Sequence, residues 1–422
     1  MNTEQLKEII ISQKEDFLNL SSLMERDALN KVKEFKNLPH IIVIKGLRRS
    51  GKSVFLSQIN NLLYKRKNAY VNFDDERLIT FNIGEFEKLY ETFLSLNEDK
   101  VYFLDEIQNL KDWERPIRRL YDKKIKFYLT GSNASLLSKE LGTKLTGRNI
   151  QIEIYPFSFK EFLKISNFKL NKDSFYLTKE KSKIKSLFNE YFSDGGMPEY
   201  IQYNKKEIIQ QVYEDILLKD IFVRYNLDND KQLRLLTKYL LTNVGVLFSY
   251  NSLKKLLGFG SVNTVMKYIS YLENAYLLFE LEKYEFSLKK QIQQNKKIYA
   301  IDVSFINLIS FKFSENKGRL LENLVFIELK RRGKEIYYHR AKKECDFLIK
   351  QGLDIVDAIQ VCYNLDEDNK KREFSGLIEA CKIYNLKECL LLTYDYEDEL
   401  ILEDVKIVIK PVWKWLLTFV NN

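Results

Sequence analysis

The chain has 422 residues, which at roughly 150 residues per domain leaves room for two to four domains. Its composition, with 45% hydrophobic and 30% charged residues but only 5 prolines and 15 glycines, excludes disordered, collagen-like and low-complexity proteins. The net charge of +9 permits nucleic-acid binding without requiring it, because a DNA-binding protein is recognised by a clustered basic face.

The sequence has few histidines and cysteines that could act as catalytic residues or metal ligands. The only histidines are His40 and His339, which excludes a two-histidine zinc motif and leaves no Ser-His-Asp arrangement. The four cysteines lack the paired spacing of a zinc site and are expected to be reduced core thiols. No uncharged apolar stretch approaches the about 18–20 residues that cross a bilayer, and no signal peptide is recognisable. We therefore expect a cytoplasmic protein.

The first third of the chain alternates short apolar runs with longer helical patterns. The runs predict strands at 41–45, 69–73, 101–104, 126–129 and 150–154. This alternation is typical of βαβ units, so the sequence predicts an α/β fold with a doubly wound parallel sheet.

A phosphate-binding loop follows the first predicted strand. Glycines in the pattern GxxxxGK[ST] let backbone N–H groups point at phosphate oxygens, while the lysine neutralises β- and γ-phosphate charge. We predict that Lys52 has this function, that Ser53 ligates Mg²⁺, and that Arg48 and Arg49 either touch phosphate or point to solvent. The predicted nucleotide-binding residues are Gly46, Leu47, Arg48, Arg49, Ser50, Gly51, Lys52, Ser53 and Val54.

An acidic pair, Asp105 and Glu106, ends the third predicted strand. In a nucleotide hydrolase the two residues of such a pair have different functions. Asp105 would hold Mg²⁺, and Glu106 would orient and deprotonate the attacking water. The alternative is an ordinary carboxylate pair at a helix start. Asp74 and Asp75, after the second strand, would either join the magnesium site or begin a helix.

Two further positions are candidate catalytic residues. Thr130, Ser132 and Asn133 follow the fourth strand, where Asn133 would contact the γ-phosphate or the attacking water; alternatively these residues turn the chain and cap a helix. Arg148 precedes the fifth strand and would stabilise transition-state charge at its own or a neighbouring γ-phosphate, unless it is an exposed structural residue.

These motifs together resemble a known family. GLRRSGKS, NFDDERL, VYFLDEIQNLKDWE, LTGSN and LTGR followed by IYPFSFKEF are similar to AAA-type P-loop ATPases of archaea and bacteria that carry a C-terminal domain resembling the PD-(D/E)xK nuclease fold. The resemblance is strongest over 40–165. It implies ATP binding by a sheet of the additional-strand catalytic-glutamate type. Guanine specificity is not expected, because the chain has DEIQ where a GTPase would have DxxG.

The middle of the chain has helical spacing over 166–245, typical of a lid or small bundle. Over 246–310 two helices precede two strands, an order that suggests a winged helix. The basic loop at 289–297, which begins at Lys289 and ends at Lys297, would either touch a DNA phosphate backbone without reading bases or bind no DNA.

The last part, 311–422, is assigned a nuclease-like fold by the resemblance. Glu322 and Asp346 match two of the metal-binding carboxylates that this fold implies, but Gln360 replaces the next one and Cys362 replaces the lysine. A two-metal site needs clustered negative charge, so we expect an α/β interaction domain without catalytic activity. The lysines that could take the missing position are Lys343 and Lys350.

The sequence thus predicts an ATPase domain with an N-terminal helix (1–165), a helical lid (166–245), a winged-helix-like segment (246–310) and a nuclease-like domain (311–422). We expect Mg²⁺-dependent ATP hydrolysis coupled to a conformational change in the C-terminal segments, with a protein partner and with oligomerisation possible. The alternatives are a nucleotide-gated switch with negligible turnover and a DNA-cleaving effector.

Overall fold

The structure is a computed structural model that describes residues 1–20, 24–64, 68–96, 99–132, 145–227, 230–311 and 316–418. It divides into two compact units. Unit 1 comprises Met1–Tyr155 with Asn274–Tyr276, and unit 2 comprises Pro156–Glu273 with Leu277–Asn422. The predicted boundaries at 165, 245 and 310 stay predictions.

Unit 1 is built on a parallel sheet whose strands lie in the order β2-β3-β4-β1-β5. Each strand overlaps a predicted range, so the predicted parallel α/β sheet is confirmed. The strands are β1 (Ile41–Gly46), β2 (Asn68–Asn72), β3 (Asp99–Asp105), β4 (Lys126–Gly131) and β5 (Asn149–Ile154).

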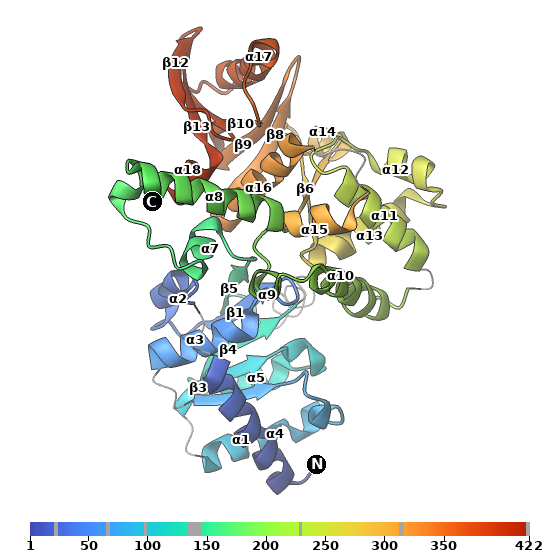
Figure 1. Cartoon of the computed structure of the whole chain (residues 1–422). Coiled ribbons are helices and arrows are strands. Elements are labelled where there is room, and N and C mark those ends of the chain that lie inside the picture. The colour runs from blue at the N-terminus through green and yellow to red at the C-terminus, as the bar shows by residue number, and fades with distance from the viewer. Residues whose placement is uncertain are drawn as a thin grey trace. The chain divides into compact units, whose positions relative to one another are not determined.

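Helices cover both faces of this sheet (Figure 1). On β1, Ile41 and Val43 belong to one apolar core while Ile42 and Ile44 belong to the other. A strand that is buried on both faces needs a continuous apolar run, which is why the sequence shows no alternation here. The helices are α1 (Thr3–Asn19), α2 (Leu29–Phe35), α3 (Lys52–Tyr64), α4 (Phe86–Ser95) and α5 (Glu114–Asp122).

The strand order determines which loops meet at the carboxyl edge of the sheet. Strand β4 lies between β1, which precedes the phosphate loop, and β3, which ends in Asp105. Because all the strands are parallel, the segments that follow β1, β3 and β4 emerge side by side at that edge. Ligands of open α/β sheets bind at such edges.

Unit 2 contains a mixed sheet in the order β12-β13-β11-β10-β9-β8 and a separate antiparallel pair, β6-β7. Strands β10, β11 and β13 run parallel, while β8, β9 and β12 are antiparallel to their neighbours. The strands are β6 (Leu278–Leu281), β7 (Lys297–Ala300), β8 (Glu335–Arg340), β9 (Glu344–Gln351), β10 (Asp354–Cys362), β11 (Glu388–Thr393), β12 (Asp398–Leu402) and β13 (Val405–Pro411).

Helices fill the rest of unit 2, and α10 continues into a π-helix, η6 (Ile216–Val223). The order α12, α13, β6, β7 agrees with the predicted elements, but the winged-helix fold itself stays a prediction. The helices are α7 (Phe159–Ile165), α8 (Thr178–Asp194), α9 (Pro198–Tyr203), α10 (Lys206–Asp215), α11 (Asp230–Thr242), α12 (Tyr250–Leu257), α13 (Val262–Asn274), α14 (Leu288–Gln293), α15 (Val303–Ile309), α16 (Lys317–Arg331), α17 (Glu367–Ile383) and α18 (Val412–Leu417).

Helix α17 packs closely on β9 because residue 376 is glycine. A β-carbon at Gly376 would lie 1.9 Å from the Glu344 carbonyl oxygen. We therefore expect Gly376→Ala to lower the free energy of unfolding by about 1–3 kcal/mol, as overpacking does. Urea denaturation checks this, with Gly318→Ala as the control, since a β-carbon there meets its nearest atom at 3.6 Å. Equal stability of both variants would contradict the close packing.

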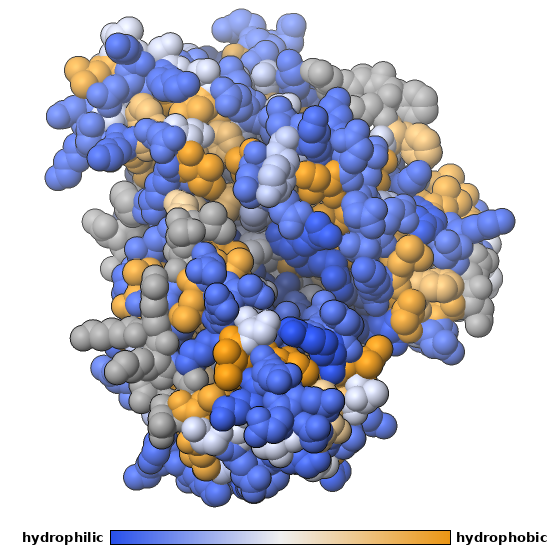
Figure 2. All heavy atoms as spheres, turned by 60° about the horizontal axis from the view of Figure 1, so that its bottom comes forward, coloured by the Kyte–Doolittle hydropathy of each residue, from blue (hydrophilic) through white to orange (hydrophobic). Residues whose placement is uncertain are grey.

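No helix among the described residues is long and apolar enough to cross a membrane. On the face shown in Figure 2, hydrophilic side chains predominate and apolar ones lie in small separate groups. The four cysteines are buried and free of disulfides, as expected of core thiols.

Candidate functional site

The loop between β1 and α3 has a backbone suited to phosphate. Arg49 and Gly51 have positive φ angles of 60° and 94°, and such turns direct consecutive N–H groups toward one point. A β-carbon at Gly46 would lie 2.2 Å from the Ile154 carbonyl oxygen, so the approach of the chain to β5 requires glycine there. Among the described residues, the buried Ser50 hydroxyl has no hydrogen-bond partner.

Lys52 is buried at the first position of α3, with 5% of its surface exposed. Its ammonium donates a hydrogen bond to the Leu47 carbonyl oxygen at 3.1 Å and lies 3.8 Å from Glu106 Oε1. The loop lysine and a carboxylate from another strand end therefore share one site.

Asp105 is fully buried at the end of β3. Its carboxylate accepts hydrogen bonds from the hydroxyls of Ser53, Thr130 and Tyr70, the last at 3.1 Å. Burial and then the charge of Glu106 raise the pKa of Asp105, and these hydrogen bonds only partly oppose them. A positive charge at this point would stabilise the ionised carboxylate.

Glu106 follows with a left-handed backbone, φ 50°, which is uncommon for glutamate. Its backbone N–H donates to Thr130 Oγ1 at 2.9 Å, and its carboxylate accepts a hydrogen bond from the Gln108 amide. Because the Thr130 hydroxyl also bonds Asp105, one side chain on β4 ties the strand end to the turn. This turn brings the Glu106 carboxylate beside Lys52.

Sequence reasoning missed Arg26, which braces the phosphate loop. Its buried guanidinium donates to the Ser50 carbonyl oxygen at 3.0 Å and to the Tyr155 carbonyl oxygen at 2.6 Å. Its backbone N–H donates to Gln58 Oε1 on α3 at 3.2 Å. Arg26 belongs to no motif, and its contacts depend on the tertiary structure, so no sequence signal points to it.

Of the other two catalytic candidates, the structure describes only Arg148, and it does not place Arg148 at this site. Asn133 lies outside the described residues. Arg148 precedes β5, whose first residue pairs with Ile41 at the start of β1, whereas the phosphate loop follows the end of β1. A six-residue strand spans about 20 Å, so Arg148 does not reach the loop of its own chain. Its guanidinium instead lies 3.9 Å from Asp122 Oδ1 and 5.6 Å from the centre of the Tyr121 ring.

Of the two alternatives for Asp74 and Asp75, the geometry favours a helix start. Asp75 accepts a hydrogen bond from the Arg77 backbone N–H at 2.9 Å, where the short helix η2 (Glu76–Leu78) begins. The Arg77 guanidinium, 2.7 Å away, holds the pKa of Asp75 well below its ordinary value. Asp74 accepts a hydrogen bond from the Asn109 side chain at 3.0 Å.

The structure corrects the prediction that 289–297 is a basic loop. This segment contains α14, and its last two lysines are buried. Lys296 pairs with Glu282 at 2.5 Å, and Lys297 lies among carboxylates of α16 and β9. Only Lys289 and Lys290 remain exposed for the predicted contact with a DNA backbone, and that contact stays a prediction.

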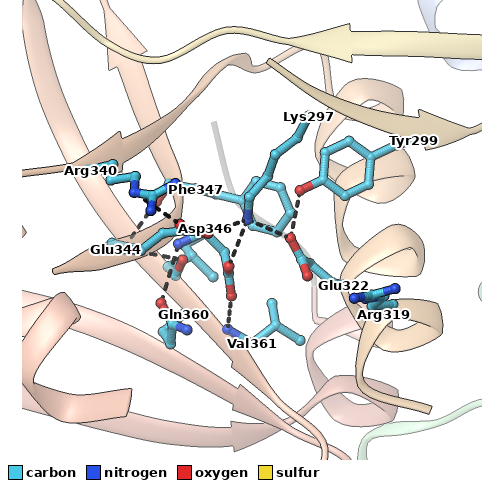
Figure 3. A network of polar contacts seen from close by, with 12 residues as sticks. Lys297, Tyr299, Arg319, Glu322, Arg340, Glu344, Asp346, Phe347, Gln360 and Val361 are labelled. Atoms are coloured by element: carbon cyan, nitrogen blue, oxygen red, sulfur yellow. Dashed lines mark hydrogen bonds and ion pairs between the residues drawn. The ribbon is translucent and has the colours of Figure 1, made fainter. Parts of the chain in front are cut away.

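The nuclease-like candidates Glu322 and Asp346 do lie together, on either side of Lys297 (Figure 3). Gln360 is not a free ligand, because its oxygen accepts the Asp346 backbone N–H at 3.2 Å and its amide donates to Glu373 at 2.8 Å. Of the lysines considered from the sequence, Lys350 pairs with Glu335. Over the described part of the chain, no group of three or more His, Cys, Asp or Glu residues is arranged to hold a metal ion.

Comparison with protein-family models divides the chain into three matches. Residues 38–163 match the model described as an AAA domain. Residues 185–316 and 317–415 match two models, each described as a domain of unknown function (DUF8612 and DUF4143). The P-loop AAA domain is thus confirmed, whereas the winged-helix and nuclease-like folds stay predictions.

Several proteins are similar to this chain. An uncharacterized protein of Methanocaldococcus jannaschii is 38% identical over 95% of this chain and 94% of its own length. An uncharacterized protein of Haemophilus influenzae is 30% identical over 95% of this chain and all of its own length. The solved structure of AMPPCP-bound DnaA from Aquifex aeolicus aligns at 19% identity, with a TM-score of 0.26, over 60% of this chain and 90% of that one. The chain therefore belongs to the same family as the archaeal and bacterial relatives, and its residues 38–163 form an AAA domain.

Proposed function

We propose that unit 1 binds Mg·ATP at the carboxyl edge of its sheet and hydrolyses the γ-phosphate with a water molecule activated by Glu106. The observation that carries the proposal is the 3.8 Å approach of Lys52 Nζ to Glu106 Oε1, from two different strand ends. Lys52 would neutralise phosphate charge while the adjacent carboxylate accepts a proton from the attacking water.

The phosphate loop supports this proposal through its backbone and its unused polar group. The positive φ angles of Arg49 and Gly51 suit a concave array of N–H groups, and the α3 N-terminus adds positive potential. The buried Ser50 hydroxyl, which lacks a partner among the described residues, is a further donor for phosphate oxygen.

The residues beneath the loop fit a magnesium ion. Ser53 and Asp105 already lie in hydrogen-bond contact, and both offer oxygen, the ligand type that Mg²⁺ prefers. Burial and then the charge of Glu106 raise the pKa of Asp105, and a bound cation would lower it. These two residues would hold the ion. When bound, Mg²⁺ supplies positive charge beside the β- and γ-phosphate oxygens. Thr130 would keep Asp105 and Glu106 in register with each other.

Arg148 and Asn133 would have more limited functions in this reaction. Arg148 would act only on the nucleotide of a neighbouring copy, since it lies at the opposite edge of its own sheet. Asn133 is retained as a contact of the γ-phosphate or the water. Hydrolysis would be coupled to a conformational change in unit 2, which would act as an interaction domain for a protein partner.

Replacing Lys52 by alanine is expected to weaken ATP binding at least tenfold, because a buried cation would be lost from the phosphate site, and one decade corresponds to about 1.4 kcal/mol. Fluorescent ATP titration in Mg²⁺ checks this, with the exposed Lys31→Ala on α2 as the matched control. Equal ATP affinity of Lys52→Ala and wild type would show that the nucleotide does not bind at this loop. Binding lost only in Lys52→Ala supports the site, whether or not turnover follows.

A further inference from the structure

Lys297 is a deeply buried cation of unit 2 that faces several carboxylates. Its side chain is 2% exposed. Its ammonium lies 2.9 Å from Glu344 Oε1, 3.0 Å from Glu322 Oε1 and 3.1 Å from Asp346 Oδ1 (Figure 3). The ammonium group thus has three acidic neighbours, which matches its three N–H donors.

The carboxylates are held in place by the elements around them. Glu322 accepts a hydrogen bond from the Tyr299 hydroxyl at 2.6 Å, and Asp346 Oδ2 accepts the Val361 backbone N–H at 3.0 Å. Arg340 lies 3.8 Å from the second oxygen of Glu344. Each of the three carboxylates is therefore held by a second group as well as by Lys297.

The charges of the cluster do not cancel. When all three are ionised, Glu322, Glu344 and Asp346 carry three negative charges, against one from Lys297 and one from the exposed Arg340. Burial, and then the charge of Asp346, raise the pKa of Glu322 to about 7 despite the opposing effect of Lys297. A site with excess negative charge would accept a cation of higher charge than an ammonium group.

The cluster joins parts of unit 2 that are distant in sequence. Lys297 lies on β7, Glu322 on α16, and Glu344 and Asp346 on β9. The segment that follows β6, the strand paired with β7, is also bonded to β8 of the mixed sheet. The Tyr338 N–H donates to the Glu282 carbonyl oxygen at 3.0 Å, and the Tyr284 N–H donates to the Tyr338 carbonyl oxygen at 2.9 Å. Lys297 is thus inserted between a helix and a sheet by an element that lies outside both.

We propose that Glu322, Glu344 and Asp346 form a cation site whose cation in this chain is the ammonium group of Lys297, and that this lysine closes the site to divalent metal ions. The ion pairs of these carboxylates with Lys297 then hold the β6-β7 pair against the mixed sheet. Unit 2 does not cleave DNA by metal-assisted hydrolysis, because the position between its carboxylates is taken by the chain itself. Removal of the ammonium opens the position to a divalent cation.

The test compares Mn²⁺ binding by full-length wild type, Lys297→Ala and Lys297→Ala/Asp346→Asn, by thermal unfolding and by electron paramagnetic resonance of free Mn²⁺. The phosphate loop is unchanged in all three proteins, so an ion that it holds is common to them. We expect Lys297→Ala to bind one more Mn²⁺ than wild type. At about 100 times the dissociation constant, the ion should raise the melting temperature of Lys297→Ala by roughly 5 °C or more. The double variant should lose this effect.

Two controls keep the outcome decisive. Lys296→Ala removes the neighbouring buried lysine, which pairs with Glu282 outside the cluster, and should gain no Mn²⁺ site. Wild type and Asp346→Asn should bind equal amounts of Mn²⁺; an ion that wild type binds and Asp346→Asn does not would overturn the proposal. If Lys297→Ala folds only with Mn²⁺, the proposal is supported. If it binds no additional Mn²⁺, or stays unfolded with and without the ion, the carboxylates are not a cation site.

Discussion

Replacement of Glu106 by glutamine is expected to slow ATP hydrolysis by about 10²–10⁴-fold, the range that loss of a general base produces, while ATP stays bound. The amide keeps the shape of the carboxylate and can still accept a hydrogen bond from Gln108, but it cannot take a proton from water. Initial rates of phosphate release and fluorescent ATP titration on the same preparation separate turnover from binding.

The backbone conformation at residue 106 is expected to be the same in Glu106→Gln as in wild type. Its left-handed conformation, φ 50°, costs glutamate and glutamine similarly, so the variant should fold like wild type. Asp112→Asn is the matched control, because Asp112 is a nearby acidic residue that also has a positive φ angle, 59°. Wild-type turnover in Glu106→Gln would show that another group activates the water.

Replacement of Lys297 by methionine is expected to lower the free energy of unfolding of unit 2 by about 3–5 kcal/mol. Methionine fills a similar volume but leaves three carboxylates without their buried cation, and an uncompensated buried charge is costly. Burial alone would lower the pKa of Lys297, but the surrounding acidic groups outweigh it and raise the pKa well above its ordinary value. Hydrogen exchange of the β7 and β9 amides reports this loss within unit 2.

The deficit of Lys297→Met should grow as the pH rises from 5 to 8. The pKa of Glu322 is about 7 in the folded chain, above its ordinary value of 4.5, so the stability that this group contributes is present below pH 4.5 and is lost as the pH rises through 7. Without Lys297, burial and the charge of Asp346 raise the pKa of Glu322 further, because only the Tyr299 hydrogen bond still opposes them, and the loss of stability at pH 8 is larger. Adding Glu322→Gln should remove this pH dependence; a deficit that is equal at both pH values would show that Glu322 is not coupled to Lys297.

The sheet of unit 1 could be predicted because its local patterns agree with its tertiary environment. The apolar run at 41–44 is buried on both faces, and the residues that follow β1 and β3 must meet once the strands are parallel. Sequence alone does not determine that β4 lies between β1 and β3. The position of Arg148 could also be predicted from the parallel sheet. A residue that precedes a parallel strand lies at the amino edge of the sheet, away from the phosphate loop.

The contacts of Arg26 and Lys297 could not be predicted, for a different reason. Both are single basic residues whose partners lie on separate elements, so no local spacing encodes their contacts. The sequence places Lys297 at the end of a run that is basic and polar, whereas its burial depends on the pairing of β7 with β6. Sequence spacing therefore points to Lys343 and Lys350 for the lysine that the nuclease-like pattern lacks, and not to Lys297.

Hydrolysis at the phosphate loop is tested by single-turnover phosphate release from Mg·ATP by excess wild-type protein, with Glu106→Gln measured in parallel. We expect wild type to convert bound ATP to ADP and phosphate in a reaction that needs Mg²⁺, and Glu106→Gln to retain the ATP intact. Tight ATP binding without phosphate release by wild type, with or without duplex DNA, would contradict hydrolysis at this site and leave a nucleotide-gated switch.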